Sequence, residues 1–263
     1  MKTTSLSLKS AIALLAVCLL APLTHAQFAA STGFDYTSGK YGLDTETKIS
    51  TWNLTGEYSY EGLSAKVTIP HEHVTSPIGV IVLNGHPRLQ KRLNAQNQGK
   101  TQTEAGLGDV ETSLSYNVCH ELQTDWNVTI TGSVKLPTAD DEKGLGTGKT
   151  DYGFAIDLSR AIGRLTPSIG FGYRIIGNPT GADLRNYLYA NIGAGYWVTD
   201  TTNLNLTFES DQRSSAGSNV DNELSFGLNH HLAKSWDIEA HVLAGLSESA
   251  PDFGLGASVR YTF

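Results

Sequence analysis

A glycine-rich run near the middle of the chain is the first candidate for chemistry, because it ends in lysine and threonine. Residues 144–150 read GLGTGKT, which is close to the loop that binds nucleotide phosphates. That loop requires a glycine five residues before its last one, and this chain has Lys143 there. It must also join a strand to a helix, whereas alternating residues on both sides predict two strands. We therefore interpret the run as a flexible loop between strands.

Two histidines are the second candidate, because their spacing would let them share a metal ion. His71 and His73 flank Glu72, and in an extended segment both imidazoles would point to the same side. No other cysteine or histidine cluster lies near them in the sequence, and His86 is isolated. The residues fit a polar loop entrance better than a metal centre, so we expect no metal and no cofactor.

Hydrolytic chemistry is the third possibility, and it would need a nucleophile and a base within hydrogen-bond reach. No histidine lies two residues from a serine on an outward-facing strand near its outer end, and the G-x-S-x-G elbow is absent. We therefore expect no catalytic residue, and an enzyme is the weakest of the functional interpretations.

Charged residues at every second position are more informative than these motifs. Such positions share one face of a strand, so their side chains would form one wall. Isolated buried ions are costly, so this wall requires water or paired charges. It fits a hydrated pore that favours cations or neutral solutes, and also a charge-paired interior without a through path. The candidates for lining a pore are Asp109, Glu111, Lys135, Asp151, Asp157, Arg174, Arg185, Glu209, Glu223, Asp237, Glu239 and Arg260, with Glu57, Lys66 and Asp221 on the same parity.

The segments that carry these charges alternate between apolar and polar residues, which is the period of a β-strand. Most approach the ~9–11 residues that a tilted strand needs to cross a bilayer, whereas soluble strands usually have ~5–6. Strands are predicted near 28–38, 47–60, 63–70, 106–118, 126–137, 150–159, 165–177, 185–198, 203–211, 220–230, 236–246 and 253–263.

The connections between these segments are short and long in turn. The gaps at 61–62, 160–164 and 199–202 are short, whereas those at 71–105 and 138–149 are long. Bacterial barrels have short periplasmic turns and longer outer loops. We therefore predict an all-β fold, a transmembrane antiparallel up-and-down β-barrel of about 12 strands. A secreted β-sandwich or lipocalin-like barrel would also alternate, but would not explain strand length and loop asymmetry together.

The beginning of the chain has the features of an export signal. Lys2 and Lys9 precede an uncharged, largely apolar run, and Thr24-His25-Ala26 then offers a cleavage site. We predict a cleaved signal peptide over 1–26 and an outer-membrane barrel domain over 27–263. Removal of the two lysines changes the formal net charge from −7 to −9, which argues against nucleic acid as a partner.

The end of the chain has the features of an assembly signal. The last five residues alternate and include Tyr261 and the terminal Phe263. This ending resembles the signal by which the barrel-assembly machinery recognises outer-membrane proteins. The expected partners are therefore that machinery, outer-membrane lipid and lipopolysaccharide, and a small-molecule solute.

The connection at 71–105 is far longer than its neighbours, and long loops are usually functional or disordered. Arg88, Lys91, Arg92 and Lys100 make it net basic beside an acidic lumen, and it contains an apolar stretch over 78–83. We expect part of it to fold into the mouth and narrow the barrel, held by attraction to the lumen acids. Alternatively, its cations contact lipopolysaccharide phosphates outside.

Four short motifs carry a family resemblance, namely 106–110 (GLGDV), 135–138 (KLPT), 144–148 (GLGTG) and 172–174 (GYR). With them, the chain from Gly106 onward resembles the outer-membrane family named for the meta-pathway of phenol degradation. That family usually has glycine after Pro-Thr, where this chain has Ala139. The resemblance implies passage of aromatic or other small compounds across the outer membrane. We expect a channel or facilitator for small solutes, the alternative being a structural or surface-interaction barrel without a through pore.

Overall fold

The computed structural model describes residues 26–42, 44–83, 86–89, 100–120, 122, 124–179, 184–212 and 220–263. The predicted signal peptide over 1–26 lies almost wholly outside this part. The strands are β1 (Gln27–Gly39), β2 (Thr47–Tyr60), β3 (Leu63–Pro77), β4 (Val80–Leu83), β5 (His86–Leu89), β6 (Thr101–Leu107), β7 (Val110–Asn117), β8 (Trp126–Leu136), β9 (Asp151–Arg160), β10 (Leu165–Ile175), β11 (Tyr187–Trp197), β12 (Thr202–Asp211), β13 (Asp221–Ala233), β14 (Trp236–Gly245) and β15 (Phe253–Thr262). No helix of the described residues is long and apolar enough to cross a membrane.

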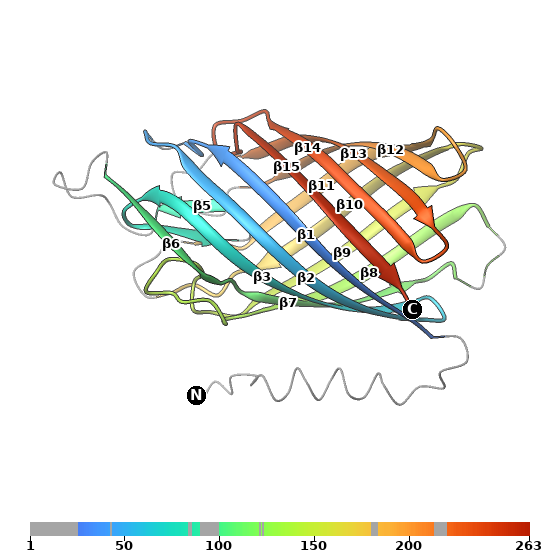
Figure 1. Ribbon diagram of the computed structural model, residues 1–263, viewed down its shortest axis with the longest axis horizontal. Helices are drawn as coiled ribbons and strands as arrows, with labels where there is room; N and C mark the ends of the chain where they lie inside the picture. The colour runs from blue at the N-terminus through green and yellow to red at the C-terminus, as the bar shows by residue number, and fades with distance from the viewer. Residues whose placement is uncertain are drawn as a thin grey trace.

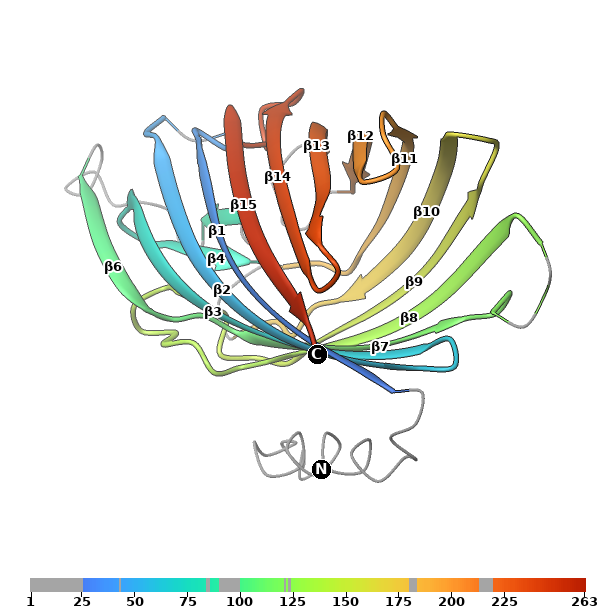
Figure 2. The same ribbon diagram turned by 45° about the vertical axis from the view of Figure 1, so that its right-hand side comes forward.

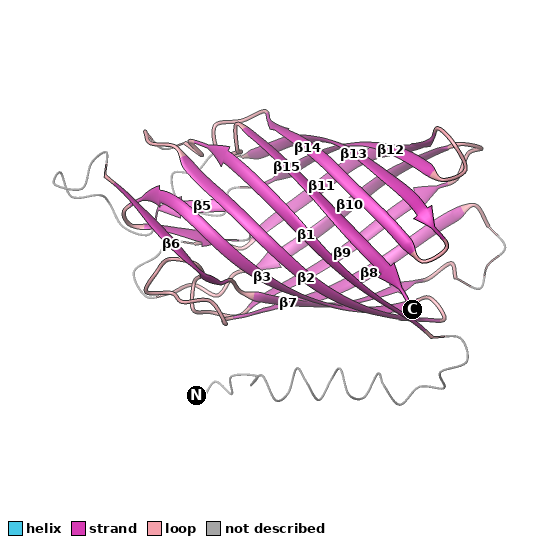
Figure 3. Cartoon of the chain, viewed as in Figure 1, coloured by secondary structure: helices cyan, strands magenta, loops and turns pink. Residues whose placement is uncertain are grey.

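The wall is one antiparallel sheet that closes on itself (Figures 1 and 3). Consecutive strands pair from β7 to β15, and β1 pairs with both β15 and β2. Strand β3 then closes the ring, because it pairs with β2 on one side and with β7 on the other. The seam between β1 and β15 runs from Ala29 opposite Thr262 to Ser38 opposite Phe253, which places both ends of the barrel chain at one rim. This confirms the predicted fold, an up-and-down barrel with twelve strand positions.

The fourth strand position differs from the sequence prediction. A single strand over 106–118 was expected after a strand that ended at 70, but β3 continues to Pro77 and pairs with both β6 and β7. The outward side chains of this extension are His71, His73 and Thr75, which are polar because this part of β3 belongs to the outer end of the barrel. Because the outward side chains of this extension are polar, apolar and polar residues do not alternate along it, and the sequence pattern does not indicate a strand.

Apolar side chains cover the outside of the barrel. Trp52, Leu54, Phe154 and Ile192 are each more than half exposed, the reverse of a soluble protein. Aromatic rings also gather at the rim where the chain ends, since Tyr261 contacts Trp236 at 4.8 Å and the terminal Phe263 at 4.9 Å between ring centroids. Such an apolar band with aromatic residues at its edge is what a bilayer requires of a transmembrane barrel.

Candidate pore and its outer mouth

A β-bulge interrupts the fourth strand position near the rim opposite the chain ends. We call this rim the outer mouth, because its long connections predict that it faces outward. His71 pairs with Leu107 and Thr68 pairs with Glu111, so residues 108–110 face only Ile69 and Pro70. An extra residue of this kind bends a strand and re-aims its side chains. Here it places Asp109 inside the barrel, where its carboxylate reaches Lys135.

The hydroxyl of Thr138 completes the hydrogen bonding of this bulge. Val110 N–H donates to Thr138 Oγ1 at 2.9 Å, and that hydroxyl donates to the Gly108 carbonyl at 2.9 Å. Strand β8 ends at Leu136, one residue before a proline, so it offers no further backbone partner here. Gly108 is required for the close fit, since a Cβ there would come within 2.9 Å of Glu72 Oε1.

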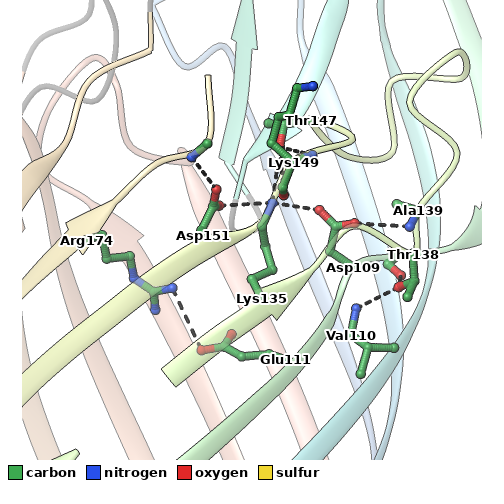
Figure 4. Close-up of polar contacts among 12 residues, drawn as sticks. Asp109, Val110, Glu111, Lys135, Thr138, Ala139, Thr147, Lys149, Asp151 and Arg174 are labelled. Atoms are coloured by element: carbon green, nitrogen blue, oxygen red, sulfur yellow. Dashed lines mark hydrogen bonds and ion pairs between the residues drawn. The ribbon is translucent and has the colours of Figure 1, made fainter. Parts of the chain in front are cut away.

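A buried lysine, Lys135, joins the wall of the barrel to the outer loops. It forms a polar cluster with Asp109, Thr147 and Asp151, which we call the Lys135 junction. Lys135 Nζ lies 2.6 Å from Asp109 Oδ2, 3.0 Å from Asp151 Oδ2 and 3.4 Å from Thr147 Oγ1 (Figure 4). Its side chain is only 6% exposed. Both aspartates also accept backbone hydrogen bonds, from Ala139 N–H at 3.0 Å and from Gly177 N–H at 2.8 Å.

The apolar stretch of the 71–105 segment lies inside the outer mouth, as expected from the sequence. Strands β4 and β5 form a hairpin within the ring of wall strands (Figure 2). Val82 of β4 packs with inward-facing Ile49 and Val74, whereas Ile81 packs with Tyr187. Strand β4 therefore bridges two sides of the mouth, from the β2–β3 wall to the wall that contains β11.

The described part of this hairpin is attached by apolar contacts. Val80, Ile81 and Val82 are each at most 4% exposed. A backbone hydrogen bond adds to these contacts, since Val82 N–H donates to the Gly144 carbonyl at 2.9 Å. The predicted attraction between loop cations and lumen acids stays a prediction, because the side chains of Arg88, Lys91 and Arg92 lie outside the described part of the chain.

The four family motifs meet around this mouth. The GLGDV motif forms the bulge, and KLPT supplies Lys135 and Thr138. The GLGTG motif is the loop before β9, and its Leu145 packs in the apolar cluster with Val82. From GYR, Arg174 lies 3.8 Å from Glu111 and 5.9 Å from the centroid of the Tyr189 ring. Residues that are far apart in sequence thus build one structural unit, and the glycine run joins two strands as predicted.

The lumen contains three adjoining cavities. The outer cavity, beneath β4, measures about 250 Å³, and the middle cavity about 420 Å³. These two share Asp35 and Asn53 as lining residues. The third cavity measures about 390 Å³ and shares Glu239 and His241 with the middle one. Polar side chains therefore border a chain of cavities inside the wall.

Most of the predicted pore residues either line these cavities or take part in ion pairs inside the barrel. Asp109, Glu111 and Lys135 line the outer cavity, Glu239 and Arg260 the middle one, and Glu209 and Glu223 the third one. Of the others, Asp151 belongs to the Lys135 junction, and Arg174 forms an ion pair with Glu111. Asp157 lies on β9 opposite Gly170 of β10, and Asp237 contacts His231. Arg185 was predicted within a strand but precedes β11.

Two acidic residues that line the cavities were missed as candidates. Glu72 was assigned to a loop, and its side chain is 8% exposed and lines the outer cavity. Asp35 accepts a hydrogen bond from Asn53 at 2.7 Å and lies 3.6 Å from His241. The parity of β1 could have identified Asp35, because Phe34 and Tyr36 alternate with it.

His71 and His73 lie on the outer face of β3, opposite in direction to Glu72. Both side chains are exposed, and they point to the same side as predicted. His71 pairs with Trp52 and His73 with Ser50 across the sheet. Among the described residues, no group of three or more histidine, cysteine or acidic side chains is placed to hold a metal ion.

Comparison with solved structures places this fold among bacterial outer-membrane barrels. An outer membrane channel from Pseudomonas putida F1 superposes with a TM-score of 0.70 at 12% identity, covering 92% of this chain and 97% of that one. The NanC porin gives a TM-score of 0.54 at 14% identity, covering 88% and 98% of the two chains. The KdgM porin, solved with disordered oligogalacturonate, gives 0.51 at 9% identity, covering 89% and 99%. The fold is therefore that of bacterial outer-membrane barrels.

Comparisons of sequence give a narrower result. No curated protein matches the chain. One family model does match, over residues 33–263, and its description reads "Putative MetA-pathway of phenol degradation". The match extends beyond the stretch after Gly106 in which the motifs were recognised and spans nearly the whole barrel. The chain belongs to this family.

Proposed function

We propose that this barrel is an outer-membrane channel for small solutes, in which the β4–β5 hairpin narrows the outer mouth. The observation that carries the proposal is the chain of cavities inside a closed wall, bordered by polar and charged side chains. A charge-paired interior without a through path would leave little space between its side chains, whereas these cavities offer a solute both room and polar partners.

Acidic groups dominate the lining, so we propose that the channel favours cations and neutral solutes over anions. Asp35, Glu57, Glu72, Asp109, Glu111, Glu209, Glu223 and Glu239 line the cavities, against Lys66, Lys135 and Arg260. Some of these charges are paired, as in the contact of 3.2 Å between Arg260 and Glu57. The remaining excess would repel anions and attract cations.

The family description supports a narrower proposal, that the solutes include aromatic compounds. The three solved structures compared above are a channel and two porins, which supports transport over a membrane-embedded hydrolase. The remaining alternative is a barrel whose loops bind a partner and whose lumen does not conduct.

Planar-bilayer recording separates the channel from this alternative. The folded barrel, identified by its heat-modifiable migration on a gel, is added to a bilayer in potassium chloride, with detergent buffer alone as the control. We expect discrete conductance steps from the folded protein. Folded protein that inserts without conducting would reject the channel and favour the surface-interaction barrel.

A further inference from the structure

We propose that the outer cavity is a binding site for a small amine with an apolar body, an inference that rests on the proposed channel and names a class of solute for it. The first observation is Glu72, which projects from β3 into this cavity and is 8% exposed. Its Oε2 is buried and has no hydrogen-bond partner among the described residues. A buried carboxylate oxygen without a partner is costly, so it favours a ligand that donates to it.

The charge around Glu72 favours a positively charged donor. The ammonium of Lys135 is already in contact with the carboxylates of Asp109 and Asp151. Glu72 lies within electrostatic reach of both Asp109 and Lys135, so it adds a third carboxyl group to one ammonium. A second cation beside Glu72 would offset this excess, and a protonated amine combines that charge with N–H donors.

The walls of the outer cavity favour an apolar body on that amine. Ile49, Val82 and Leu145 line the cavity and are each at most 4% exposed, and Pro70 adds further apolar surface. An apolar cavity of ~150 Å³ can hold one benzene ring. The outer cavity, at about 250 Å³, has room for a ring together with a short ammonium arm. Metal ions and sugars would leave this apolar wall without a partner.

The backbone at the bulge also supports the site. Gly108 has no side chain where a Cβ would lie 2.9 Å from Glu72 Oε1, so the bulge leaves room for the Glu72 carboxylate. Asp109 then follows on the inner side of the wall and holds Lys135. Because Lys135 is also in contact with two aspartates, its single positive charge is shared among three carboxyl groups.

Calorimetric titration of the folded barrel in detergent, without a bilayer, tests this site. The probe is benzylammonium chloride, compared with benzyl alcohol, which has a similar shape and no charge, and with methylammonium, which lacks the ring. We expect benzylammonium to bind at least about tenfold more tightly than either one. Equal binding of benzyl alcohol would overturn the role of the charge, and equal binding of methylammonium the role of the apolar wall.

A substitution locates the site. Glu72→Gln should weaken benzylammonium binding about tenfold or more, because the charged partner is lost while the side-chain shape is kept. Asp125→Asn, in an exposed turn at the other rim, is the matched control and should bind like the original chain. Unchanged binding in Glu72→Gln would overturn the proposal. If that variant does not fold, the comparison of the three probes still decides.

The two proposals can fail separately in these experiments. A barrel that conducts ions but does not bind benzylammonium would overturn the amine site and leave the channel intact. A barrel that binds benzylammonium through Glu72 but does not conduct would reject the channel, and the outer cavity would then be a ligand site of a non-conducting barrel.

Discussion

At the scale of single residues, Lys135 holds the outer mouth together. It contacts two carboxylates that come from different strands, and those carboxylates also accept N–H groups of the outer loops. We expect Lys135→Met to destabilise the barrel by about 3–5 kcal/mol, because it leaves buried carboxylates without their cation. Unfolding by guanidinium in detergent measures the loss. Lys66→Met, an exposed lumen lysine on β3, is the control and should change stability little.

Thr138 provides a second test at this scale, through one hydroxyl that bonds two backbone groups of the bulge. Thr138→Val should cost about 1–3 kcal/mol, because Val110 N–H and the Gly108 carbonyl lose their partner. Thr138→Ser keeps the hydroxyl and should retain most of the stability in the same unfolding assay. Equal loss in both variants would mean that the methyl group, rather than the hydrogen bonds, matters.

Alternation along the strands was enough to predict which side chains face inward, because the period of a strand fixes their side. Alternation alone predicts that Asp109, Lys135 and Asp151 face the lumen. The contact among them was beyond the sequence, since it depends on a bulge that shifts parity by one residue. Glu72 was missed for a related reason, because the strand that carries it has a polar outer face at the mouth.

At the scale of elements, the β4–β5 hairpin is the part whose removal should change conduction. The double substitution Ile81→Ser and Val82→Ser removes apolar contacts worth about 1.5–3 kcal/mol for each buried side chain. We expect the hairpin to detach and single-channel conductance to rise, since β4 would no longer bridge the mouth. Val118→Ser, at an exposed apolar position, is the control. Unchanged conductance in the folded double variant would show that the hairpin does not limit the path.

The elements of the wall were predicted more accurately than those at the mouth. Strands inside the bilayer alternate strictly because one face meets lipid and the other meets the lumen. Strand β6 and the extension of β3 lie at the mouth, where neither face of a strand must be apolar. Their sequences therefore lack the alternation of a strand and predict a long loop instead. The apolar run over 78–83 did indicate that this loop folds inward, although not that it forms a strand.

At the scale of the whole molecule, the terminal strand closes the barrel, and Phe263 lies at its end. Its N–H donates to the Phe28 carbonyl at 2.8 Å, and its ring is 77% exposed to the surroundings of the wall. We expect Phe263→Asp to lower sharply the amount of heat-modifiable barrel in the outer membrane, because the aromatic ending is lost. Phe263→Tyr is the control. Normal assembly of Phe263→Asp would mean that the ending has no role in recognition.

We infer the orientation of the barrel from its short turns and long loops, which predict that both termini lie in the periplasm. A tag at Thr201, in the short turn before β12, should therefore be hidden from antibody on intact cells. A tag at Ala182, which lies outside the described residues, should be reached because it belongs to a long connection. Labelling of both sites, or the reverse pattern, would contradict the proposed orientation.

We propose above that the lumen conducts ions and that the excess of acidic over basic side chains along it favours cations. The reversal potential of the folded barrel in a planar bilayer, under a tenfold gradient of potassium chloride, tests it most directly. We expect a reversal potential whose sign shows that potassium is more permeant than chloride. Its magnitude should fall at high salt, because salt screens the exposed charges. A potential with the sign set by chloride, or no current from inserted and folded protein, would contradict the claim.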